Sequence, residues 1–118
     1  MKVLFDHNLP FKLRTDMVGI CDLEISTAAW MGWRELKNGE LLRAAEEGGF
    51  DVFVTGDRTL VLEQNVMGRR LAVVVLSANN WPIIRTRIRE ILAAIETVVP
   101  GSVRIVECGL FSRRTPRD

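Results

Sequence analysis

The fold is decided by a short buried stretch, Val52-Phe53-Val54-Thr55-Gly56-Asp57. Four β-branched or aromatic residues in a row, closed by glycine and an acid, are typical of a strand that is covered on both faces. A second continuous apolar run extends from Leu71 to Leu76, and Val3-Leu4-Phe5 is a third, again followed by an acid, Asp6. Strands of this kind belong to parallel sheets. The sequence therefore predicts an α/β protein with a mostly parallel central sheet.

Helical patterns lie between these strands, as a parallel sheet requires. Pro10 and Pro82 are each expected to open a helix at its first turn, and Asn38 is expected to cap a third. The sequence predicts helices at residues 10–18, 38–47 and 82–99 and further strands at 20–26 and 103–106.

The chain has 118 residues, of which 47% are hydrophobic and 26% charged. This composition is that of a folded domain and excludes a disordered chain. We expect one domain over residues 1–112 and a loose basic tail over residues 113–118. No apolar run reaches the roughly 18 residues that a membrane span needs, and an acid stands at position 6, so we expect a cytoplasmic protein without a membrane partner. The spacing of Cys21 and Cys108 indicates no metal site.

The formal net charge is +1, which hides a difference between the two halves. Residues 1–58 carry ten acids and seven bases, whereas residues 59–118 carry five acids and nine bases, all arginine. Arginine suits bidentate contacts with phosphate. Near neutrality therefore does not exclude a nucleic-acid partner, although an ordinary solvated surface would give the same sum.

Three acids are expected at one edge of the sheet. Asp6 and Asp57 each follow a strand, and ligands of open parallel sheets bind beyond the carboxyl ends of the strands. Glu40 stands in the first turn of a helix whose N-terminus belongs at the same edge. Carboxylates that converge repel one another unless they share a cation. Oxygen ligands without His or Cys favour Mg²⁺ or Mn²⁺, which can promote in-line attack on a phosphodiester.

Each acid also has a purely structural interpretation, which the sequence leaves open. Glu40 can complement the positive end of its helix. Asp6 and Asp57 can be turn residues that cap the segments they precede.

Three motifs of the chain resemble those of the PIN-like domains, and more narrowly of small stand-alone bacterial proteins related to VapC-type toxins. They are Leu4-Phe5-Asp6-His7-Asn8-Leu9-Pro10, Asn38-Gly39-Glu40-Leu41-Leu42 and Val54-Thr55-Gly56-Asp57-Arg58. The resemblance implies a three-layer α/β/α fold and a Mg²⁺- or Mn²⁺-dependent endoribonuclease. It also implies a cognate antitoxin as partner and allows a homodimer. Asp6 and Asp57 match two acidic positions of the family.

The chain departs from the family pattern at three positions. His7 stands where related proteins often have Glu, Asn38 where they often have Asp, and Thr59 where many place a further Asp. The acidic set is thinner as a result. An alternative interpretation is therefore a catalytically weak or inactive PIN-like module that binds RNA or a protein partner.

The remaining candidate residues follow from this interpretation. We expect Asp6, Glu40 and Asp57 to be the catalytic and metal-binding residues. Polar neighbours are expected to support them: Asn8, Asn38, Thr55 and Asn65. Arginines are expected to contact RNA: Arg58, Arg85 and Arg89. Tryptophan in loops can stack on unpaired bases, although for Trp33 and Trp81 a place against the core is the favoured interpretation.

Overall fold

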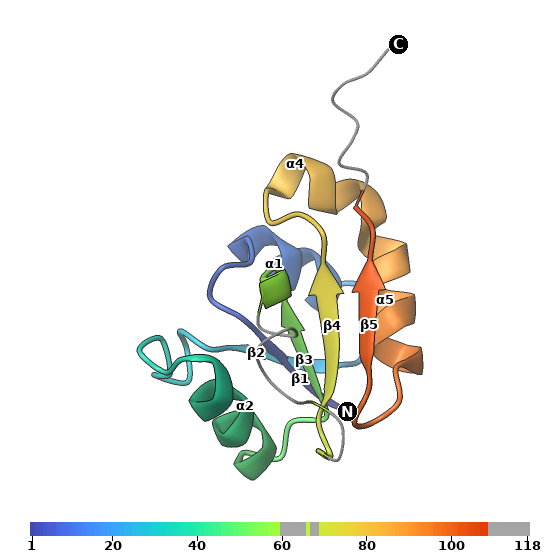
Figure 1. Cartoon of the computed structure of the whole chain (residues 1–118). Helices are drawn as coiled ribbons and strands as arrows, with labels where there is room; N and C mark the ends of the chain where they lie inside the picture. The colour runs from blue at the N-terminus through green and yellow to red at the C-terminus, as the bar shows by residue number, and fades with distance from the viewer. Residues whose placement is uncertain (60–65, 67–68, 109–118) are drawn as a thin grey trace.

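The computed structural model of the chain describes residues 1–59, 66 and 69–108. Its centre is a five-stranded sheet in which every neighbouring pair of strands is parallel (Figure 1). The strands lie in the order β2-β1-β3-β4-β5. Their bounds are β1 Lys2–Phe5, β2 Glu24–Thr27, β3 Val52–Thr55, β4 Ala72–Leu76 and β5 Val103–Val106. The prediction of a parallel α/β sheet is confirmed.

Helices cover both faces of the sheet. Their bounds are α1 Phe11–Val18, α2 Asn38–Glu47, α4 Trp81–Ile84 and α5 Ile88–Thr97, with a 3₁₀ turn, Arg85–Arg87, between the last two. Alternate residues of a strand point to opposite faces, and in β1 the side chains of Val3 and Phe5 pack with α1, α4 and α5. Leu4 points the other way and packs with α2. The protein therefore has three layers, with α2 on the other side of the sheet from α5 (Figure 1).

The central strands are buried because both faces are covered. All four residues of β3 and all five of β4 are buried, as the continuous apolar runs predicted. The two edge strands, β2 and β5, contain fewer buried residues than the central strands. In β5 the Arg104 and Ile105 side chains are exposed. Within residues 1–59, 66 and 69–108, no helix has the length and apolar character that crossing a bilayer requires.

Three element boundaries differ from the prediction. The strand expected at 20–26 begins only at Glu24, because the N–H groups of Ile20 and Cys21 both bond back to the Met17 carbonyl and close α1. Asn38 was expected to cap the second helix, but it is the first residue of α2. Lys37 occupies the cap position and forms no capping hydrogen bond with its side chain. The helix expected at 82–99 is interrupted by the 3₁₀ turn.

The tryptophans fall into two groups. Trp33 packs edge-on against Phe50, with ring centroids 6.1 Å apart, and Trp81 packs against the core on the α1 face. Both therefore lie against the core, as the favoured interpretation predicted. Trp30 is 83% exposed and follows the edge strand β2. The predicted tail at residues 113–118 lies outside the described residues.

Candidate functional site

The site begins where β1 and β3 end side by side. These strands are parallel neighbours with Phe5 opposite Val54. The next residue, Asp6, continues the pairing, because its N–H donates to the Val54 carbonyl at 2.9 Å. The register therefore brings Asp6 to the same edge as the residues that follow Val54, as the sequence predicted for Asp6 and Asp57.

Thr55 connects the two acids. Its hydroxyl donates a hydrogen bond to Oδ2 of Asp6 at 2.7 Å and accepts one from the N–H of Asp57 at 3.0 Å. Both Thr55 and Asp6 are buried, and a buried carboxylate needs such donors. Thr55 thus has the supporting position expected of it.

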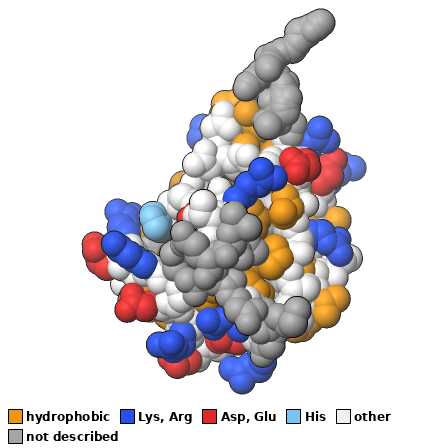
Figure 2. All heavy atoms as spheres, viewed as in Figure 1, with side chains coloured by type: hydrophobic (Ala, Val, Ile, Leu, Met, Phe, Trp, Pro, Cys, Tyr) orange, Lys and Arg blue, Asp and Glu red, His pale blue; other side chains and the backbone are white. Residues whose placement is uncertain are grey.

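The other oxygen of Asp6 faces His7. Oδ1 accepts the N–H of His7 at 2.7 Å, and the imidazole Nδ1 lies 3.0 Å from the same oxygen. The His7 ring is 46% exposed, so it stands at the boundary between the buried carboxylate and solvent. Figure 2 shows the one histidine of the chain at the surface.

Asn8 ties the two strand ends together. Its Oδ1 accepts the N–H of Gly56 at 3.3 Å. Helix α1 has no side-chain cap, so Asn8 does not cap it. Gly56 is closely packed here, since a Cβ atom at this position would lie 3.2 Å from the Cβ of Asn79. The amide of Asn8 therefore fixes the backbone that carries Asp57.

Asp6 and Asp57 open into one hollow of about 220 Å³, which we call the acidic hollow. Its lining is completed by residues from the turn after β1 and from the start of α2: His7, Asn8, Leu36, Lys37 and Leu41. The α2 N-terminus therefore reaches this edge of the sheet, as predicted. A cation, Lys37, stands with the two acids, and the sequence reasoning did not single it out.

Glu40 does not line the acidic hollow. It lies in the first turn of α2, as expected, and is exposed. Leu41 lines the hollow from α2, and Lys37 lines it from the position just before the helix. Glu40 is rotated by about 100° from Leu41, because successive residues of a helix turn by that angle. The position in the first turn was predicted, but not the direction of the side chain.

The residues present suit a small, hard cation. Within the described part of the chain, no three His, Cys, Asp or Glu side chains are grouped to hold one ion. Mg²⁺, however, is commonly held by one or two carboxylates and completes its shell with water and substrate phosphate. Asp6 and Asp57 provide two carboxylates in one hollow. The two carboxylates fit Mg²⁺ or Mn²⁺, which Asp6 and Asp57 would hold.

Asp57 is itself held by Thr59, two residues further along the chain. Its Oδ1 accepts both the N–H and the hydroxyl of Thr59. Thr59 therefore fixes the carboxylate orientation instead of adding a negative charge. Of the other supporting residues, Asn38 begins α2 but its side chain lies outside the described part, as does Asn65.

The arginines expected to contact RNA lie in two places. Arg58 directly follows Asp57 and pairs with Glu107 at 3.4 Å on the surface. Arg85 and Arg89 line a separate hollow together with Ile20, and this hollow shares no residue with the acidic one. Two further cations, which the sequence did not predict, line hollows that include Asp6: Lys37 in the acidic hollow and Arg34 in an adjoining one.

Glu46, near the far end of α2, has a structural role. Glu46 accepts hydrogen bonds from the Arg69 guanidinium at 2.7 Å and from the N–H of Arg70 at 2.8 Å. Burial alone would raise the pKa of this carboxyl, but these two donors outweigh it and hold the pKa below the ordinary value of 4.5. Glu46 does not line the acidic hollow, and its carboxylate is taken up by these two partners.

Comparisons of the chain with models of protein families, with curated proteins and with solved structures found no match.

Proposed function

We propose that the protein is a metal-dependent endoribonuclease of the PIN-like superfamily and the toxin component of a toxin–antitoxin pair. The observation that carries the nuclease assignment is the juxtaposition of Asp6 and Asp57 in one hollow at the carboxyl edge of a parallel sheet. The resemblance of the three motifs to PIN-like domains supports the choice of RNA as substrate. The antitoxin and a homodimer are predictions from that resemblance.

The roles of the residues follow from their contacts. Asp6 and Asp57 would hold the cation, and Thr55 keeps both in place through its two hydrogen bonds. When bound, Mg²⁺ or Mn²⁺ supplies Lewis-acid chemistry, lowering the pKa of water and offsetting charge on the phosphodiester. Lys37 and Arg58 stand where they can contact phosphate oxygens, and Lys37 lines the acidic hollow itself.

Cleavage of single-stranded and structured RNA tests this proposal. The purified protein is incubated with each RNA in Mg²⁺, in Mn²⁺ and in chelator, beside Asp57→Asn and Glu47→Gln. We expect cleavage only with the metal, loss in Asp57→Asn, and full activity in Glu47→Gln, whose exposed side chain lies at the far end of α2. Cleavage that persists in chelator or in Asp57→Asn contradicts the metal mechanism.

A second candidate function is a PIN-like module that binds RNA or a protein without cleaving. It is favoured by the small acidic set, since Glu40 does not line the acidic hollow and a cation does. This candidate predicts RNA binding that weakens with salt, as counterion release requires, and no cleavage with any metal. Binding that ignores salt would argue instead for a protein partner.

A further inference from the structure

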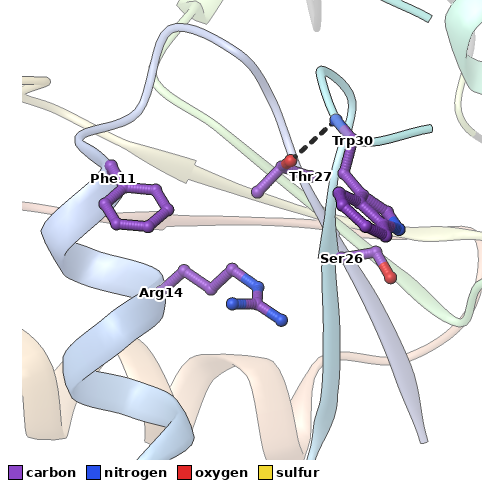
Figure 3. A pocket seen from close by; sticks show the side chains of 5 residues that line it. All are labelled: Phe11, Arg14, Ser26, Thr27 and Trp30. Carbon is purple, nitrogen blue, oxygen red and sulfur yellow. Dashed lines mark hydrogen bonds between the residues drawn. The ribbon is translucent and has the colours of Figure 1, made fainter. Parts of the chain in front are cut away.

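A second hollow, of about 310 Å³, lies between α1 and the edge strand β2. Its lining is Phe11, Arg14, Ser26, Thr27 and Trp30, and we call it the aromatic hollow. Figure 3 shows the Phe11 ring on one side and the Trp30 indole on the other, with the Arg14 side chain extending between them. The N–H of Trp30 donates to the Thr27 hydroxyl at 3.0 Å, which ties the tryptophan to the end of β2.

Both aromatic rings of this hollow are open to solvent. Phe11 is 73% exposed and Trp30 is 83% exposed. Leu13 and Met17 form the buried side of α1, so Phe11 contributes little to the core. Exposed aromatic side chains that share a hollow indicate a binding surface, and the flat face of a nucleobase is a ligand that such rings hold by stacking.

Arg14 gives the aromatic hollow a fixed positive charge. Its Nε donates to the Ile25 carbonyl at 2.9 Å, which anchors the guanidinium to β2. A guanidinium has five N–H donors, so this bond leaves donors for a ligand. No carboxylate within residues 1–59, 66 and 69–108 forms an ion pair with Arg14. A phosphate oxygen is the ligand that this geometry favours.

A third hollow lies between the aromatic hollow and the proposed catalytic site, and it shares residues with both. It shares Phe11, Arg14 and Thr27 with the aromatic hollow. The same third hollow includes Asp6 and His7, which also line the acidic hollow, and it adds a second arginine, Arg34. Two arginines, Arg14 and Arg34, therefore line the hollow that lies between Asp6 and the exposed rings.

The geometry points to a subsite for one unpaired nucleobase of a single-stranded RNA, stacked on Trp30 opposite Phe11, with an adjoining phosphate on Arg14. This subsite rests on the proposed function, because the scissile phosphodiester would lie at Asp6 and Asp57. The exposed rings would hold the strand by its bases, so the subsite favours unpaired RNA over a duplex.

Binding in chelator tests the subsite separately from cleavage. Affinity is measured by fluorescence anisotropy with a short labelled oligouridine and with an abasic oligomer of equal length. Trp30→Ala should weaken oligouridine binding about tenfold and leave the abasic oligomer unchanged, whereas Trp30→Phe should restore most of the affinity. Arg14→Ala should weaken both oligomers more than Lys12→Ala, which removes an exposed charge from the same helix outside the hollow.

The outcomes separate this inference from the proposed function. Equal loss for both oligomers in Trp30→Ala, or no loss for either, overturns the base subsite even where Asp57→Asn abolishes cleavage. A selective loss for oligouridine supports the subsite even where no metal gives cleavage. Glu47→Gln should bind oligouridine in chelator as the unmodified chain does, because its exposed side chain lies at the far end of α2 and lines neither the aromatic nor the acidic hollow. Far-ultraviolet circular dichroism confirms that each variant is folded.

Discussion

The Thr55 hydroxyl lies 2.7 Å from Oδ2 of Asp6 and is fully buried at the end of β3. The Thr55 hydroxyl oxygen also accepts the N–H of Asp57, at 3.0 Å. One side chain therefore supports the first acid directly and the second through its backbone. The position of the two carboxylates relative to each other depends on this threonine.

Replacing Thr55 by valine should destabilise the fold and disorganise the site. Valine keeps the shape but leaves the buried Asp6 oxygen without its donor, which should cost about 1–3 kcal/mol. Urea denaturation measures the change in free energy of unfolding. Thr55→Ser retains a hydroxyl and should keep metal-dependent cleavage. A Thr55→Val protein as stable and as active as the original would show that the hydrogen bond is not needed.

Gly56 is expected to accept a side chain only at a cost in stability. An added Cβ would lie 3.2 Å from the Cβ of Asn79 and 3.5 Å from Cδ2 of Leu9. Gly56→Ala should therefore destabilise the protein by about 1 kcal/mol or more through overpacking. Gly19→Ala is the control, because Gly19 has φ −77° at the end of α1 and should accept alanine with a neutral or slightly stabilising effect. Thermal unfolding that ranks the two variants the other way would contradict this description of the packing.

Much of the fold could be predicted because the strongest signal, continuous apolar runs, reflects burial on both faces. The strand at Val52–Thr55 has the expected bounds. The interruption of the helix at Arg85–Arg87 could not be predicted, since Ile84, Ile88 and Ile91 keep apolar spacing on either side of the 3₁₀ turn. One 3₁₀ turn changes the spacing of apolar residues along the sequence too little to be detected.

The site was predicted in part. Strand ends placed Asp6 and Asp57 correctly, because parallel register fixes which edge they share. The direction of the Glu40 side chain depends on how α2 is rotated about its axis. A position in the first turn does not determine that rotation. The excess of arginine in residues 59–118 suggested phosphate contacts there. The cations that line the hollows, Lys37, Arg34 and Arg14, instead belong to residues 1–58, which carry a net negative charge. The exposure of Phe11 could have been predicted from the sequence, because Phe11 does not lie on the side of the helix that carries Leu13 and Met17.

Glu46 gives a pH dependence that is independent of the site. Its pKa is lower in the folded chain than in the unfolded chain, so the unfolded state takes up more protons as the pH falls. The ion pair with Arg69 is therefore fully stabilising above the ordinary carboxyl pKa and is lost as the pH falls through the folded pKa. Glu46→Gln should cost about 1 kcal/mol at neutral pH and much less in acid.

Denaturation of Glu46→Gln at neutral and acidic pH measures this difference, with Glu47→Gln as the control. Glu47 is the next residue and is exposed, so its replacement should change stability little at either pH. A loss in Glu46→Gln that is equally large in acid would show that charge is not the cause.

Arg58 should contribute one phosphate contact to RNA binding. Arg58 directly follows Asp57. Its ion pair with Glu107, at 3.4 Å, is exposed and therefore too weak to prevent Arg58 from binding a phosphate of RNA. Arg58→Ala should reduce the slope of log affinity against log salt by about 0.7, the value for one contact with a single strand. Arg43→Ala removes an exposed charge from α2 and is the control. An unchanged slope in Arg58→Ala places the RNA elsewhere.

Binding of Mn²⁺ tests the central claim most directly, because the claim is that Asp6 and Asp57 hold one divalent cation. Calorimetric titration of the intact chain, without RNA, compares the unmodified protein with Asp6→Asn, Asp57→Asn and Glu40→Gln. We expect one ion per chain, affinity lowered at least about tenfold in both aspartate variants, and unchanged affinity in Glu40→Gln. No uptake by the unmodified protein, or equal uptake by Asp57→Asn, would contradict the claim.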